Sequence, residues 1–165
     1  MLKIRSRGFT LIELLVVIAI IGILSAVVLA SLNTARSKGN DAAIKSNLDT
    51  IRTQSGIYYD TNNGYSTGAT TVAAALTGTT AACTAATNSI FNDANITNAI
   101  TAAGTAAGGA SNVICAIDAA TAPAKPTVWA VSAKLTAAPN TWWCVDSTGK
   151  SAQNAVGTIA AAACP

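Results

Sequence analysis

The chain has 165 residues, a formal net charge of +3 and an apolar fraction of 51%, much of it alanine. It contains no histidine, one glutamate and six scattered aspartates, so general acid–base pairs and transition-metal sites are hard to assemble. Composition therefore argues against an enzyme, and we expect no cofactor. The first eight residues account for the whole net charge, which thus gives no indication of a nucleic-acid partner.

The N-terminal segment is a short basic stretch followed by an apolar run. Lys3, Arg5 and Arg7 precede the run, which extends without a charge from Leu14 to Leu32. As a helix these residues span about 28 Å, close to the hydrocarbon thickness of a bilayer. Basic residues before a span favour a cytoplasmic N-terminus. The sequence predicts a single-pass helix in the inner (cytoplasmic) membrane with the rest of the chain outside.

A cleaved secretory signal peptide and a plain signal anchor are the alternative interpretations of this segment. The run is longer than the ~7 to 15 residues of a signal-peptide core. A carboxylate, Glu13, also lies at its start, where it costs about 2 to 3 kcal/mol on insertion scales and needs a partner. Both features count against a cleaved signal.

Residues 8–13 read Gly-Phe-Thr-Leu-Ile-Glu and lead directly into the apolar run. With this motif the first 60 or so residues resemble the type IV pilins and pseudopilins. The resemblance implies that a prepilin peptidase cuts between Gly8 and Phe9 and methylates the new amino group, so that residues 1–8 are a leader peptide. It also implies a platform protein and a cytoplasmic ATPase as assembly partners.

The resemblance gives Phe9 and Glu13 a physical role in assembly. Cleavage creates an ammonium group at Phe9, which Glu13 of a neighbouring subunit would neutralise when the helices bundle in a medium of low dielectric. The helix of residues 9–32 would then form the filament core. Many bacterial pilins have a proline in this run, whereas here Gly22 weakens the helix by only about 1 kcal/mol.

An amphipathic continuation of the helix is predicted over residues 33–62. Its apolar face consists of Ile44, Leu48, Ile51, Ser55 and Tyr58, at spacings of four and three. We expect this face to pack under a sheet of the same chain. The sequence Asn-Asn-Gly at residues 62–64 predicts the end of the helix.

Residues 63–165 are expected to form a globular head domain. Its first part is rich in Ala, Thr, Gly and Asn, with short helices predicted at residues 72–77 and 89–103. The last third is predicted to be β-structure. Alternation over residues 127–135 places Trp129, Val131, Ala133 and Leu135 on one face.

A turn at residues 137–140 leads to a second strand at 142–147, and residues 148–150 supply the next turn. The predicted fold is therefore α+β: a long N-terminal helix packed at its C-terminal half against a small antiparallel sheet.

Four cysteines, Cys83, Cys115, Cys144 and Cys164, lie on the outer side of the predicted span. An oxidising compartment and a small alanine-rich core both favour disulfides. Four cysteines allow three connectivities. We prefer Cys115 with Cys144, because they flank the strand at 127–135, and Cys83 with Cys164. Without a Cys-x-x-Cys pair or a histidine, no metal site is expected.

Two further groups of residues have both a structural and a functional interpretation. Asp118 and Asp146 are isolated, so they are expected to cap turns rather than to hold calcium. Trp129, Trp142 and Trp143 offer an aromatic patch for adhesion, although the alternation places at least one of them in the core.

The primary hypothesis is a structural subunit of a type IV pilus or related extracellular filament, which polymerises through its N-terminal helix. The alternatives are a type II secretion-type or minor pseudopilin, and a membrane-anchored adhesin or binding module that never polymerises. Glu13 argues against the last. No residue distinguishes a major pilin from a pseudopilin.

Overall fold

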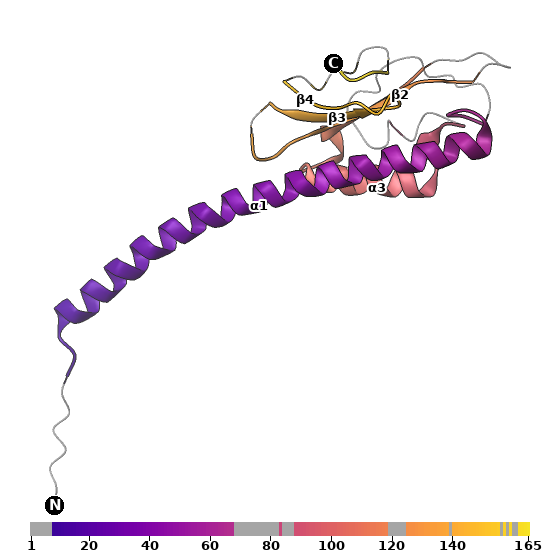
Figure 1. The fold of residues 1–165 in the computed structure, drawn as a ribbon. Helices are drawn as coiled ribbons and strands as arrows, with labels where there is room; N and C mark the ends of the chain where they lie inside the picture. Colours follow the sequence, from indigo (N-terminus) through magenta and orange to yellow (C-terminus); the bar gives the residue numbers. More distant parts are fainter. Residues whose placement is uncertain are drawn as a thin grey trace, which may run out of the picture. The chain divides into compact units, whose positions relative to one another are not determined.

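The computed structural model describes residues 8–67, 83, 88–118, 125–138, 140–155, 157, 159 and 162–165. The chain divides into two compact units, the second beginning at Ser37. Along the chain the elements are helix α1 (Leu11–Asn62), the short 3-10 helix η1 (Ile90–Asn92), helix α3 (Ala94–Ala106), the 3-10 helix η2 (Ala110–Asn112) and strands β1 (Val113–Ile117), β2 (Trp129–Lys134), β3 (Trp142–Asp146) and β4 (Ser151–Asn154) (Figure 1).

The four strands form one antiparallel sheet in the order β1-β2-β3-β4, a simple meander. On one face, Trp129, Val131, Ala133 and Leu135 are buried, as the alternation predicts. The opposite face buries Ile114, Ala116, Ala130 and Cys144 against Ile159, Ala162 and Cys164 of the C-terminal segment. Both faces of the sheet are therefore covered, the first by helices and the second by the end of the chain.

The predicted apolar stripe of α1 is confirmed. Ile44, Leu48 and Ile51 are completely buried and Ser55 is 2% exposed, while Tyr58 is half-buried at the edge of the same cluster. Helix α3 contributes Ile96, Ile100 and Ala103 to this cluster, and Figure 1 shows it beside the C-terminal half of α1. The α+β fold predicted from the sequence is thus the fold of the second unit.

Helix α1 ends where the Asn-Asn-Gly sequence predicts. Asn63 has a φ of 52° and Gly64 a φ of 152°, a conformation that residues with a Cβ rarely adopt. A Cβ on Gly64 would also lie 2.7 Å from Cδ of Lys125. The Lys125 ammonium donates a hydrogen bond to the Asn62 carbonyl, so a cation from a distant part of the chain caps this helix terminus.

The helix predicted at 89–103 is present but divided and shifted. Ser89 caps η1, and Asp93 caps α3 by accepting hydrogen bonds from the N–H groups of Asn95 (2.9 Å) and Ile96 (3.2 Å). Each cap starts its own element. The helix predicted at 72–77 lies outside the described residues.

The cysteines pair differently from the preferred prediction. The structure joins Cys83 to Cys115 and Cys144 to Cys164, with Cα separations of 5.4 and 5.7 Å. The predicted pairs, Cys115 with Cys144 and Cys83 with Cys164, were wrong. The prediction that all four cysteines form disulfides is confirmed.

The register of the sheet explains the error. Cys115 lies opposite Val131, whereas Cys144 lies opposite Ser132, so the two cysteines point to opposite faces of the sheet. Strand β2 also lies between them, and two strand spacings of about 4.8 Å exceed the roughly 7 Å limit for a bridge. Cys115 and Cys144 therefore cannot form a bridge, because β2 separates the strands that carry them.

Asp146 organises the turn between β3 and β4, as predicted for a turn-capping aspartate. Its Oδ1 accepts from the N–H of Thr148 at 3.0 Å and of Lys150 at 3.1 Å, and from the Thr148 hydroxyl at 2.6 Å. Its Oδ2 accepts from the Cys164 N–H at 3.0 Å. Burial raises the pKa of this carboxyl, but these hydrogen bonds together outweigh burial and lower the pKa below its ordinary value.

The lowered pKa predicts a specific pH dependence of the head's stability. Because the folded-state pKa lies below the unfolded one, the carboxylate stabilises the fold fully above about pH 5 and loses this effect as the pH falls through the folded pKa. We expect Asp146→Asn to cost about 1 to 3 kcal/mol at pH 7. Urea unfolding midpoints from pH 7 to pH 2.5 should converge for the two proteins, and parallel curves would contradict the assignment.

Asp41 ties α1 to the turn that follows β2. Its Oδ1 accepts from the Thr136 N–H at 2.6 Å and lies 3.0 Å from the Thr136 hydroxyl, and its carboxylate lies 3.3 Å from the Ala137 nitrogen. The Thr136 hydroxyl also reaches the Ser37 carbonyl at 3.0 Å. These bonds lie at the start of the second unit and fix the sheet to the helix there.

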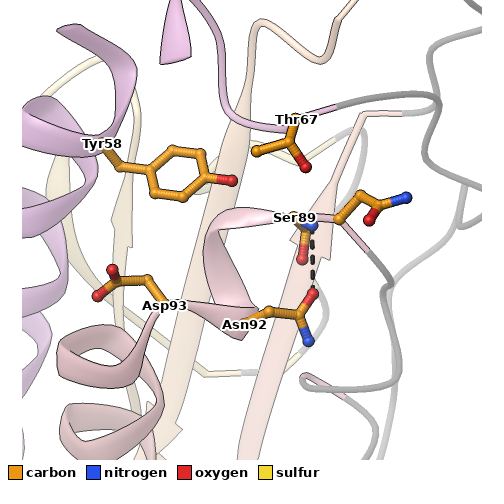
Figure 2. A pocket seen from close by; sticks show the side chains of 6 residues that line it. Tyr58, Thr67, Ser89, Asn92 and Asp93 are labelled. Carbon is orange, nitrogen blue, oxygen red and sulfur yellow. Dashed lines mark hydrogen bonds between the residues drawn. The ribbon is translucent and has the colours of Figure 1, made fainter. Parts of the chain in front are cut away.

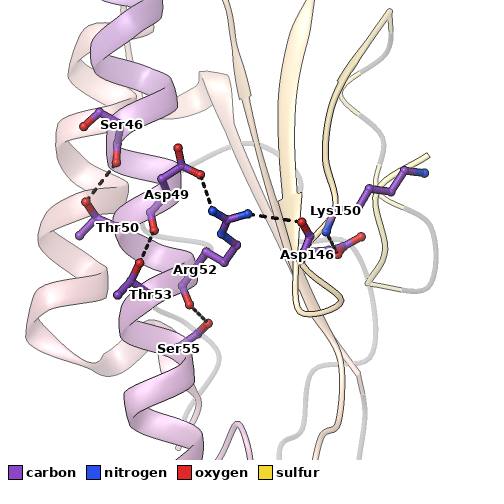
Figure 3. A network of polar contacts seen from close by, with 9 residues as sticks. Ser46, Asp49, Thr50, Arg52, Thr53, Ser55, Asp146 and Lys150 are labelled. Atoms are coloured by element: carbon purple, nitrogen blue, oxygen red, sulfur yellow. Dashed lines mark hydrogen bonds and ion pairs between the residues drawn. The ribbon is translucent and has the colours of Figure 1, made fainter.

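We expect Asp41→Ala to lower the free energy of unfolding by about 1.5 to 3 kcal/mol, because it removes a charged acceptor of several hydrogen bonds. Asp49→Ala is the matched control on the same helix. Figure 3 shows Asp49 paired with Arg52, at 3.4 Å and with both side chains exposed. Such a surface pair contributes about 1 kcal/mol or less. Equal losses in the two variants, measured by urea unfolding, would refute the role of Asp41.

Candidate processing and assembly site

The predicted cleavage site lies just before the first turn of α1. Gly8, Phe9 and Thr10 have no regular secondary structure, and the helix begins at Leu11. Phe9 is 83% exposed. A Cβ on Gly8 would meet no atom of the described residues within 4 Å, so packing against that part of the chain does not require glycine at this position. The predicted cleavage site is therefore exposed and lies outside the helix.

Thr10 and Glu13 form a reciprocal capping box. The Thr10 N–H donates to Glu13 Oε2 at 2.9 Å, and the Glu13 N–H donates to Thr10 Oγ1 at 3.3 Å. The Thr10 hydroxyl also donates to Oε2 at 2.7 Å. The negative charge therefore lies at the helix N-terminus, where the helix dipole stabilises it.

The sequence analysis did not identify Thr10 as the residue that caps α1. Its position in the motif was clear, but only the residues on either side, Phe9 and Glu13, were assigned functions. The pattern Thr-x-x-Glu before an apolar run is the signal of a capping box and was sufficient to find it. The structure brings Gly8, Phe9 and Glu13 into one short segment, and the four cysteines lie outside it.

The helix that follows is apolar on all its sides. Its most apolar 18-residue window has a mean hydropathy of 3.0 and buries nothing within the chain, and it is long enough to cross a membrane. Large side chains from Leu11 to Leu32 are all about half exposed or more. A helix with this surface is stable only in lipid or among other apolar helices. The face that α1 buries in the head begins only at Ile44.

A cavity of about 430 Å³ in the head is one alternative site (Figure 2). It is lined by Tyr58, Thr67, Asn88, Ser89, Asn92 and Asp93. Its polar groups support local structure: Asp93 caps α3, and Asn92 Oδ1 accepts from the Ser89 N–H at 3.2 Å. Burial raises the pKa of Tyr58, so its hydroxyl stays protonated near neutral pH.

The tryptophans do not form one exposed patch. Trp129 is completely buried, as the alternation predicts for at least one of the three, whereas Trp142 and Trp143 are half-buried. The Lys45 ammonium lies 4.5 Å above the Trp143 ring. Within the described residues, no group of three His, Cys, Asp or Glu side chains is placed to hold a metal ion.

Comparison with known proteins locates similarity in the N-terminal segment. The family model of the prokaryotic N-terminal methylation motif matches residues 3–29. The type IV wide pilus major component PilA4 of Thermus thermophilus is 47% identical over 62 residues, which cover 37% of this chain and 47% of that protein. The type IV major pilin protein PilA of Myxococcus xanthus is 37% identical over 62 residues, 38% of this chain and 28% of that protein.

The matched region is thus less than half the length of either relative. No solved structure matches the chain. The residues of the family model, 3–29, include the motif, the capping box and most of the exposed apolar helix. The N-terminal segment of this chain therefore carries the prokaryotic N-terminal methylation motif, and the chain is similar to type IV pilins over 62 residues.

Proposed function

We propose that the chain is the precursor of a structural subunit of a type IV pilus or related extracellular filament. The observation that carries the proposal is an apolar helix exposed on all sides whose first half lies within the methylation motif. Such a helix needs lipid before assembly and neighbouring helices after it. The head domain, with two disulfides, suits an oxidising extracytoplasmic compartment.

In this proposal the precursor is a single-pass protein of the inner membrane, with its head outside. A prepilin peptidase removes residues 1–8 and methylates Phe9. An inner-membrane platform protein and a cytoplasmic ATPase then extract the subunit. Residues 9–32 enter the filament core, residues 33–62 continue the helix into the head, and residues 63–165 complete the head.

Glu13 neutralises the ammonium of Phe9 on a neighbouring subunit during assembly. Each charge is costly alone in a low-dielectric core, and pairing reduces that cost. Because the pair joins fixed positions on two helices, it also sets their register. Extraction of about 20 apolar residues from lipid is feasible when identical helices replace the lipid.

The alternatives are a type II secretion-type or minor pseudopilin, and a membrane-anchored adhesin that does not polymerise. Both relatives are named as major pilus components, which favours a pilus subunit for this chain. They are structural proteins, and we propose that this chain likewise has no catalytic activity. Glu13 at the start of a membrane helix has no evident use in an anchor alone.

The test is to shear cells, isolate released filaments and measure the mass and N-terminal peptide of their main subunit. We expect a subunit that begins with methylated Phe9 and is lighter than its reduced form by the four hydrogens that two disulfides lack. A short, scarce filament with the same processed subunit would favour a pseudopilin. Cell-bound, uncut protein beginning at Met1 would favour the anchored adhesin.

A further inference from the structure

Glu13 receives two hydrogen bonds on one carboxylate oxygen from a single residue. The N–H and the hydroxyl of Thr10 lie 2.9 and 2.7 Å from Oε2. The same hydroxyl oxygen accepts the Glu13 N–H at 3.3 Å. A hydroxyl has one donor and two acceptor positions, so it can make both bonds at once. The orientation of the carboxylate is therefore tied to the residue that directly follows Phe9.

This arrangement matters most when the helix lies in lipid. Without water, a carboxylate must obtain its donors from protein. Thr10 supplies them from within the same chain, before any neighbouring subunit is present. A carboxylate has about four acceptor positions. Two bonds to Oε2 leave acceptor positions on the carboxylate for a further donor. Because Glu13 lies in the first turn of α1, these positions are near the place where the new ammonium would form.

We propose that Thr10 is a positioning residue for assembly: it holds the Glu13 carboxylate in the membrane-inserted precursor and presents it to the N-terminal ammonium of a neighbouring subunit. The proposal rests on the proposed function above. The hydroxyl is the group that acts here, because the backbone N–H is present in any residue other than proline. Thr10→Val removes the hydroxyl at nearly constant shape, and Thr10→Ser keeps it.

The first measurement tests whether Thr10 holds the carboxylate. Glu13 is the only glutamate in the chain, so glutamate labelled with carbon-13 at the side-chain carboxyl marks a single site. The full, uncut chain is placed in lipid vesicles and its carboxyl carbon-13 shift and carboxylate stretching frequency are recorded. We expect Thr10→Ser to match the wild type and Thr10→Val to be displaced. An unchanged signal in Thr10→Val overturns the proposal.

The second measurement tests presentation to a neighbour. We expect Thr10→Val to insert and to be cut after Gly8 like the wild type, with sheared filaments reduced about tenfold, the equivalent of one hydrogen bond to a charged group. Thr10→Ser should assemble normally. Normal yield from Thr10→Val, or a loss matched by lost cleavage, overturns the assembly role. Failure of the proposed function itself is distinct, because the wild type would then release no filaments.

Discussion

Replacement of Glu13 by leucine or alanine is expected to leave membrane insertion intact and to reduce filament yield by about a hundredfold or more. In the proposed filament the variant leaves the Phe9 ammonium of a neighbouring subunit unpaired, and an uncompensated buried charge costs about 3 to 5 kcal/mol. Insertion itself becomes easier, because the carboxylate no longer opposes it. Membrane-bound precursor and sheared filament are both measured by mass spectrometry of the same cells.

The control is Glu13→Gln, which keeps the length of the side chain and an acceptor for the Thr10 hydrogen bonds but removes the charge. If charge pairing drives assembly, glutamine fails like leucine. If Glu13 acts only as a helix cap, glutamine assembles and leucine does not. Normal yield from the leucine variant removes the pairing mechanism altogether and leaves the apolar helix as the sole basis of polymerisation.

Local patterns predicted those parts of the fold that depend on neighbouring residues. The stripe at Ile44, Leu48 and Ile51 follows from helical periodicity, and the face containing Trp129 and Val131 follows from strand alternation. Both predictions are correct because the helix and the strand each turn one face toward the same core. The motif at Gly8 to Glu13 was equally local, and it predicted the similarity that comparison then found.

Features that depend on three-dimensional arrangement were harder to predict. Strand β1 reads Val-Ile-Cys-Ala-Ile, and all five residues are buried because both faces of the sheet are covered. Such a strand shows no alternation and was not identified as a separate element. The disulfide pairing required the strand order and the face of each cysteine, which spacing along the chain does not contain. The first miss follows from the covering of the second face by the C-terminal segment, and the second from the position of β2 between the two cysteines.

Removal of the Cys144–Cys164 disulfide by a double substitution to alanine should lower the free energy of unfolding of the head by about 3 kcal/mol, the cost of releasing a loop of this size. The bridge spans 20 residues and attaches the C-terminal segment to the sheet. The core under that segment consists of small side chains, including Ala116 and Ala130, which gain little from burial. In urea, a secreted fragment beginning at Asn33 should unfold about 1 to 3 M earlier.

The Cys83–Cys115 bridge provides the matched comparison, because it spans 32 residues and joins the other face of the sheet. The loop-entropy estimate for it is slightly larger, near 4 kcal/mol. The two double variants should lose stability in different parts of the head. Without Cys144–Cys164, the described contacts that hold the C-terminal segment are the Asp146 and Lys150 bonds to residues 164 and 165 and the packing of Ile159 and Ala162, so its amides should exchange hydrogen early while the helix-facing core stays protected. Uniform loss of protection would mean instead that the C-terminal segment and the core unfold as one unit.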